Sequence, residues 1–152
     1  MSLTTSIQYN ISSSLTSDRS VSTAIGTYSN SLKSAVSSAD NIYTDASAVA
    51  SGSTSYDFSG SLENAIGDPV IFGKINYIQL VNKSTTSAIT AFGASTDIPV
   101  LTSAGSVMTI NAGGRFNMHY PSGLDVTATT ADTITIRGTG AVFELAVIGS
   151  DA

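Results

Sequence analysis

Residues 107–149 read VMTINAGGRFNMHYPSGLDVTATTADTITIRGTGAVFELAVIG, and this stretch decides the fold class. Its apolar and polar residues alternate in short runs separated by predicted turns, two of which are Gly113-Gly114 and Pro121-Ser122-Gly123. The run Thr133–Ile136, the segment Gly138-Thr139-Gly140 and the run Ala141–Ile148 together predict a β-hairpin. In the returning run Glu144 is the one charged residue, which predicts a strand covered on both faces. The stretch therefore indicates the core of an all-β domain.

The preceding segments continue the β pattern. The segments predicted as strands are 39–50 and 53–59, separated by Ser51-Gly52, then 70–82 and 88–92. Between them, Leu62–Gly67 predicts a single helical turn that glycine ends. About eight to ten short strands with turn signals about every eight to twelve residues are typical of a sandwich or barrel. We therefore expect a jelly-roll-like β-sandwich over residues 39–152.

The first 38 residues are serine-rich and form a separate prediction, an N-terminal arm. Alternation at Ile7, Tyr9 and Ile11 predicts a half-buried strand. Further on, Ile25, Tyr28, Leu32 and Val36 are spaced as one helical face, although serine, threonine and glycine are poor helix formers. A weak helix and an extended arm both stay open here, and we favour an arm that docks on a partner. The residues expected to make that contact are Ile7, Tyr9, Ile11, Leu15 and Tyr28.

The composition excludes several function classes. Only 11% of the 152 residues are charged, against about 25% in ordinary soluble domains, while 26 serines and 19 threonines supply the polarity. Such a weakly charged surface suits a protein packed against neighbours, and a stable extracellular β-protein would have the same composition. Net charge is −5 and the six basic residues are scattered, so we expect no nucleic-acid binding. The segment MSLTTSIQYN predicts no signal peptide, and no run approaches the length of a membrane helix, so we expect no membrane partner.

Catalytic and metal-binding constellations are not visible in the sequence. His119 is the only histidine, and no carboxylate lies within five residues of it on either side. The chain has no cysteine and no Gly-x-Ser-x-Gly elbow. Glu144 is expected to pair with a basic neighbour across the hairpin, such as Arg137, or to lie at an exposed edge. We therefore expect neither an enzyme nor a bound cofactor or metal, and leave a cation at a subunit interface open.

The order of the motifs resembles a family of small structural proteins encoded by tailed bacteriophages and prophages. The residues that carry the resemblance are Ala39-Asp40-Asn41-Ile42-Tyr43, Tyr56-Asp57-Phe58, Ile66-Gly67, Ile75–Asn82, Gly113-Gly114-Arg115-Phe116, Thr130–Ile136 and Val147-Ile148-Gly149. The resemblance covers about residues 39–149. It departs after Gly114, where Asn117, Met118 and His119 stand in a segment that usually holds an apolar run.

The resemblance implies a virion protein with a β-sandwich fold, located on the capsid surface or at the head-tail junction. Its implied partners are the major capsid protein and further copies of itself, in a homo-oligomer for which a trimer is one option. A first hypothesis is thus a protein that decorates or cements the capsid. Two alternatives are a neck or tail-completion protein, and a receptor- or glycan-binding jelly roll of a tail or fibre. In the last one, Phe116, His119 and Tyr120 would form the ligand-binding hairpin, with exposed aromatic rings stacked on sugars.

Overall fold

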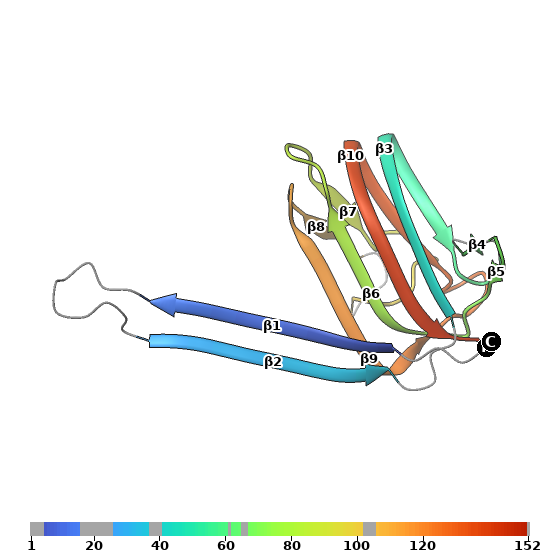
Figure 1. Cartoon of the computed structure of the whole chain (residues 1–152). Helices are drawn as coiled ribbons and strands as arrows, with labels where there is room; N and C mark the ends of the chain where they lie inside the picture. Colours follow the sequence, from blue (N-terminus) through green and yellow to red (C-terminus); the bar gives the residue numbers. More distant parts are fainter. Residues whose placement is uncertain are drawn as a thin grey trace. The chain divides into compact units, whose positions relative to one another are not determined.

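A computed structural model describes residues 5–15, 26–36, 41–60, 62–64, 67–101 and 106–151. These residues form ten β-strands and contain no helix, so the predicted all-β fold is confirmed (Figure 1). The strands are β1 (Thr5–Leu15), β2 (Gly26–Val36), β3 (Asn41–Asp57), β4 (Leu62–Glu63), β5 (Pro69–Val70), β6 (Lys74–Asn82), β7 (Ile89–Ala91), β8 (Met108–Ile110), β9 (Arg115–Asp125) and β10 (Thr133–Ser150).

Strands β1 and β2 pair with each other and form a unit distinct from the rest of the chain. Their antiparallel register runs without a shift from Thr5 opposite Val36 to Leu15 opposite Gly26. The helical alternative for this segment is therefore wrong over residues 26–36. Serine and threonine disfavour a helix, and the antiparallel ladder supplies the backbone hydrogen bonds that a helix would have made.

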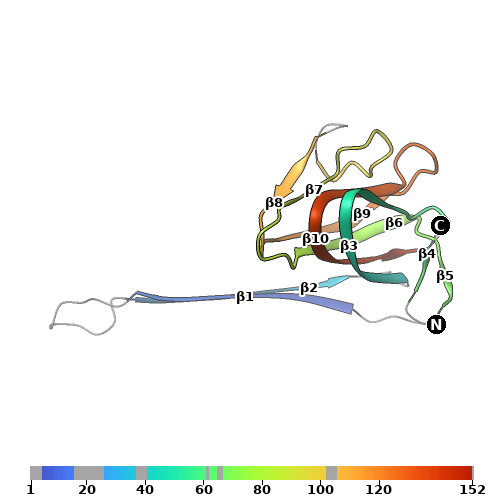
Figure 2. The ribbon, with the colours of Figure 1, turned by 90° about the horizontal axis from the view of Figure 1, so that it is seen from above.

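The second unit is built around β3 and β10, which run antiparallel along their whole lengths and bend together (Figures 1 and 2). The first limb of β10, around Ile136–Gly138, also pairs with β7, and β7 pairs with β8. The second limb, from Phe143 on, pairs with β6, and β6 pairs with β9. Two sheets thus share β3 and β10 and face each other as a sandwich that is continuous at one corner.

Glycines make this corner. Gly52 lies opposite Gly138, and Gly52 and Gly140 have left-handed φ angles of 100° and 61°. The predicted hairpin over 133–148 is therefore wrong, as is the division of 39–59 into two strands. Without a Cβ atom these positions can bend sharply, yet the two strands keep one register across the bend. A glycine segment expected to reverse the chain instead turns a strand from one sheet into the other.

The core lies between the two sheets. Phe143, Leu145 and Val147 on the second limb of β10 point inward and are at most 2% exposed. The rings of Tyr43 and Tyr56, from opposite limbs of β3, lie 5.8 Å apart, which shows that the limbs face each other. The largest of the fully buried side chains are Phe58, Phe72, Phe143, Ile75, Ile78, Leu80, Ile89, Ile98, Ile134, Ile136, Leu145 and Val147.

Two connections differ from the predictions. Leu62–Glu63 is a short strand that pairs with β5, so the predicted helical turn is wrong there. Pro121-Ser122-Gly123 does not reverse the chain, because β9 stays paired with β6 on both sides of it. It is instead part of a bulge opposite Asn76, whose Nδ2 donates to the Tyr120 carbonyl oxygen at 3.2 Å. The buried carboxamide thus satisfies a carbonyl that the bulge removes from the ladder.

Candidate functional site

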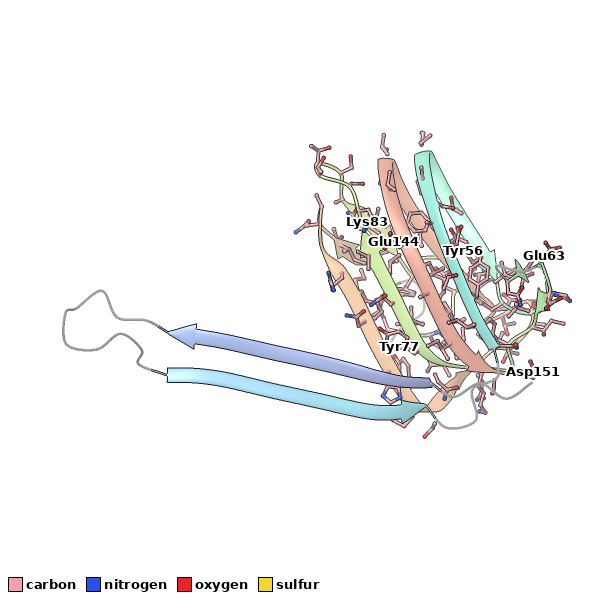
Figure 3. All side chains as sticks on the ribbon, in the orientation of Figure 1. Tyr56, Glu63, Tyr77, Lys83, Glu144 and Asp151 are labelled. Carbon is pink, nitrogen blue, oxygen red and sulfur yellow. The ribbon has the colours of Figure 1, made fainter. Side chains whose placement is uncertain are left out.

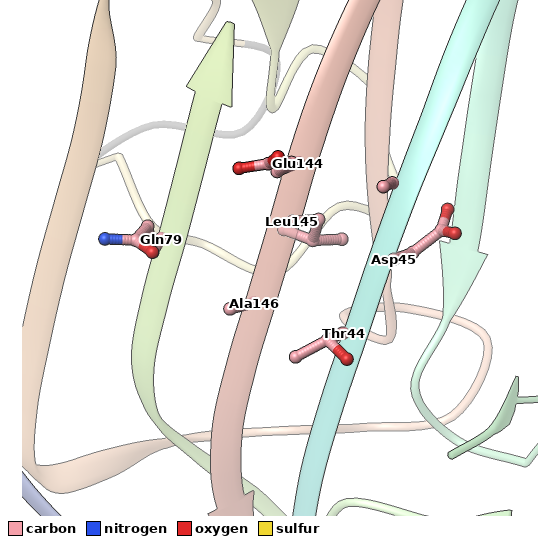
Figure 4. A pocket seen from close by; sticks show the side chains of 7 residues that line it. Thr44, Asp45, Gln79, Glu144, Leu145 and Ala146 are labelled. Carbon is pink, nitrogen blue, oxygen red and sulfur yellow. The ribbon is translucent and has the colours of Figure 1, made fainter. Parts of the chain in front are cut away.

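The outer face of the sheet formed by β9, β6, β10 and β3 carries a shallow groove. Alternation along β10 sends Phe143 and Leu145 into the core and leaves Val142 and Glu144 exposed, so the predicted two-sided covering of this strand is wrong. The groove, about 300 Å³ in volume, lies over β3, β10 and β6 (Figure 4). Its lining residues are Thr44, Asp45, Ala46, Gln79, Glu144, Leu145 and Ala146.

The groove has little charge of its own. Glu144 makes an ion pair with Lys83 at 3.3 Å, and each side chain is 50% exposed (Figure 3). The predicted partner Arg137 is wrong, because it belongs to the other limb of β10, beyond the corner. There Arg137 lines a second, more open hollow with Gly52 and Thr139. The groove face therefore offers a contact surface with two carboxylates, of which Glu144 pairs with Lys83 and Asp45 accepts hydrogen bonds within its own strand.

The three residues predicted to bind a ligand share strand β9 but not one surface. The ring of Phe116 packs against the core, 5.5 Å from the ring of Phe92 at an interplanar angle of 65°. The hydroxyl of Tyr120 donates to the Val100 carbonyl oxygen at 2.9 Å, and burial raises the pKa of Tyr120. Neither ring is an exposed platform, so the expectation of exposed aromatics is wrong. These residues lie within strand β9, which pairs with β6, and they do not form the tip of a hairpin.

His119 lies on β9 directly opposite Tyr77 of β6. Its Nε2 atom is buried and has no hydrogen-bond partner among the described residues. The described residues contain no cluster of three or more His, Cys, Asp or Glu side chains that could hold a metal ion. The described residues therefore place no set of metal ligands around His119.

A carboxylate-phenol cluster on β3 was not predicted. Tyr56 and Ser47 both donate to Oδ2 of Asp45, each at 2.5 Å. Burial, followed by this bond to Asp45, raises the pKa of Tyr56 well above its usual value of 10. Burial and the nearby Asp45 charge raise the pKa of Tyr43 as well. The raised pKa values keep both phenols protonated at neutral pH, and the bond from Tyr56 to Asp45 links the two limbs of β3.

The predicted arm residues all lie in the β1–β2 hairpin. Tyr9 is opposite Leu32, and Tyr28 is opposite Ser13 in the register of the two strands. The remaining predicted contacts, Ile7, Ile11 and Leu15, follow along β1. Their expected role as partner contacts remains a prediction, since it concerns a second molecule.

Two further findings bear on function. Among the described residues there is no helix of the length and apolarity that crossing a membrane requires. Comparison with protein-family models, curated proteins and solved structures found no match for this chain.

Proposed function

We propose that this protein is a non-enzymatic structural component of a virion, where it decorates or cements the capsid and uses its N-terminal hairpin to grip a neighbouring subunit. The proposal combines the sequence resemblance to phage structural proteins with one structural observation. That observation is the division of the chain into two units, a sandwich with its own core and a hairpin whose described strands, β1 and β2, pair with each other.

The β1–β2 hairpin is the part of the chain for which we expect a binding partner. An isolated two-stranded ribbon is marginally stable in water, because it has no third strand and no second layer to bury its side chains. Here each strand is 11 residues long and the register has no irregularity. A ribbon of this length gains stability when a surface of a neighbour covers it. An arm that becomes ordered in this way binds only where its partner surface is present.

The sandwich contributes a rigid body with a weakly charged exterior. Because only 11% of the residues of the whole chain are charged, we expect little electrostatic repulsion between closely packed copies. Repetition of a modest contact over a symmetric shell then gives strong overall attachment through effective concentration. In this mechanism the arm provides the contact and the symmetry of the shell multiplies it.

The test is binding to purified capsids that lack this protein. Co-sedimentation of the full chain is compared with a chain deleted for residues 1–38 and with a variant carrying Ile7→Ser, Tyr9→Ser and Ile11→Ser. We expect saturable binding by the full chain and loss of at least about 90% of it in both variants, since the contact residues lie on the arm.

Circular dichroism of each variant checks that the sandwich is intact, so that lost binding is attributable to the arm. A matched control replaces Ser12, Ser13 and Ser14 of the same strand by threonine, which preserves polarity and strand propensity. Unchanged capsid binding after deletion of the arm would contradict the proposal.

A further inference from the structure

The larger sheet has three open edges among the described strands, and two of them are poor templates for further pairing. Strand β8 is only three residues long. Strand β9 is interrupted by the bulge at Pro121, and a charged residue, Arg115 or Asp125, stands at each of its ends. Short strands, prolines, charges and bulges are the features by which sheets prevent edge-to-edge association.

Strand β3 is the third edge and has almost none of these features. It is 17 residues long, pairs only with β10 among the described strands, and keeps its register without a bulge. Residues 42–57 contain no lysine, arginine or proline. Within the described part of the chain, no hydrogen bond outside the β10 ladder reaches their backbone. One side of β3 therefore presents backbone donors and acceptors that another strand can use.

The straight limb of β3, before the bend at Gly52, is also sterically open. Its outward-facing side chains are all exposed, and all except Ile42 at its start are small: Thr44, Ala46, Ala48 and Ala50. A neighbouring strand lies about 4.8 Å away in a sheet, a distance that bulky or charged flanking side chains would oppose. The single charge on this limb, Asp45, is held by Tyr56 and Ser47 within its own chain.

We propose that this limb pairs antiparallel with the same limb of a second copy, about a two-fold axis that passes between the two Ala46 residues. Ala46 is the midpoint of the limb that ends near Gly52, so this register uses its whole length. It also sets Asp45 opposite the uncharged Ser47 of the second copy, so that no like charges face each other. A shift that centred the pairing on Asp45 would place two carboxylates face to face, which is unfavourable.

A second copy of this chain is the partner that fits the edge of β3, because the edge is complementary to itself. In a two-fold symmetric interface, a contact between residue i of one copy and residue j of the other occurs twice, because residue j of the first copy also contacts residue i of the second. The β3 limb can form such an interface with itself, and no like charges then lie opposite each other. The result is one continuous sheet with four strands from each copy, β9, β6, β10 and β3. This dimer goes beyond the proposed function, since it depends only on the edge of β3 and not on a shell or on the arm.

The chain contains no cysteine, so a single introduced cysteine can form a disulfide only with the same cysteine of another copy. In the full-length protein, Ala46→Cys places two thiols across the two-fold axis, where directly opposed Cβ atoms are about 4.5–5.5 Å apart. This is near the range that a disulfide bridges with small adjustment. The matched control is Ala50→Cys, an equally exposed alanine on the same face. In the proposed register, position 50 of one copy and position 50 of the other are eight residues apart, or about 26 Å along the strands.

Mild oxidation followed by non-reducing electrophoresis is expected to convert most of Ala46→Cys, and little of Ala50→Cys, to a covalent dimer. Sedimentation equilibrium of the unmodified chain should give twice the monomer mass of 15.5 kDa. Ala46→Lys should restore the monomer, because two lysines then meet at the axis, whereas Val142→Lys on the neighbouring strand should not.

Three results would overturn the inference. They are a monomeric or trimeric unmodified chain, equal cross-linking of the two cysteine variants, and a dimer in which Ala46→Cys fails to cross-link. The last result would point to another occupant of the edge, such as the arm of a neighbour. None of these outcomes depends on capsid binding, so this inference and the proposed function can fail separately.

Discussion

Gly149→Ala offers a direct test of how β10 joins β6. Gly149 lies where the register between these strands shifts, and a Cβ atom on it would stand 2.0 Å from the Lys74 carbonyl oxygen and 2.8 Å from Cδ1 of Phe72. The first neighbour is backbone and the second is a core ring, so neither can move cheaply. Alanine must therefore push the start of β6 away from β10.

The expected cost follows from what that movement breaks. The pairing of Gly149 with Ile75 and of Ser150 with Lys74 would be lost, together with the bond from the Gly73 amide to the Ser150 carbonyl at 2.9 Å. At about 1 kcal/mol for each net hydrogen bond, and with about 1 kcal/mol for disturbed packing of Phe72, the loss is about 3–4 kcal/mol. That is a large part of the 5–15 kcal/mol typical of a small domain.

The assay is equilibrium unfolding in urea, followed by far-ultraviolet circular dichroism and by the fluorescence of the six tyrosines. A midpoint lower by about 1–2 M is expected for Gly149→Ala. The control is Gly60→Ala, since a Cβ atom there meets nothing within 4 Å and Gly60 lies outside the left-handed region. Its stability should change by less than about 1 kcal/mol. Equal midpoints for the two variants would refute the steric reasoning.

Three more predictions concern the core and its polar groups. Phe143→Ala should cost about 3–5 kcal/mol of unfolding free energy, because the ring is fully buried, whereas Val142→Ala, on the exposed face, should cost less than about 1 kcal/mol; urea unfolding distinguishes them. Asn82→Ala should cost about 3 kcal/mol by the same assay, since the fully buried carboxamide donates to the carbonyls of Ser87 and Ile110, and equal stability would contradict this role. The free energy of unfolding should fall as pH rises above about 10, because the unfolded chain then releases a tyrosine proton that folded Tyr56, with its raised pKa, retains. A series of thermal unfolding curves at increasing pH should show a shallower fall for Tyr56→Phe than for the unmodified chain. An equal slope for the two proteins would contradict this role of Tyr56.

Much of the fold follows from residue patterns that act locally. Alternation at Phe143, Leu145 and Val147 placed these residues on one face of a strand, because successive side chains of a strand point to opposite sides whatever its neighbours are. It did not predict that only this face is buried, since the strand was expected to be covered on both faces. The same pattern predicted a β-strand over most of β6 and at β7. The candidate site was less accessible to such reasoning. The positions of Phe116 and Tyr120 in strand β9 could be expected, but not their contacts with Phe92 and the Val100 carbonyl, which come from segments distant along the chain.

The sequence by itself thus determined the all-β class, the residues that share a strand face and the low content of charged residues. Only the tertiary structure decided what the glycines do. Gly138-Thr139-Gly140 can reverse a chain or bend a strand, since glycine permits both backbone conformations. Pairing with β3 decides between a chain reversal and a bent strand. Strand β3 bends together with β10, with Gly52 opposite Gly138, and the hydrogen-bonded register is the same on both sides of the bend. Because that partner lies about 80 residues earlier in the chain, no local pattern around Gly138 could reveal it.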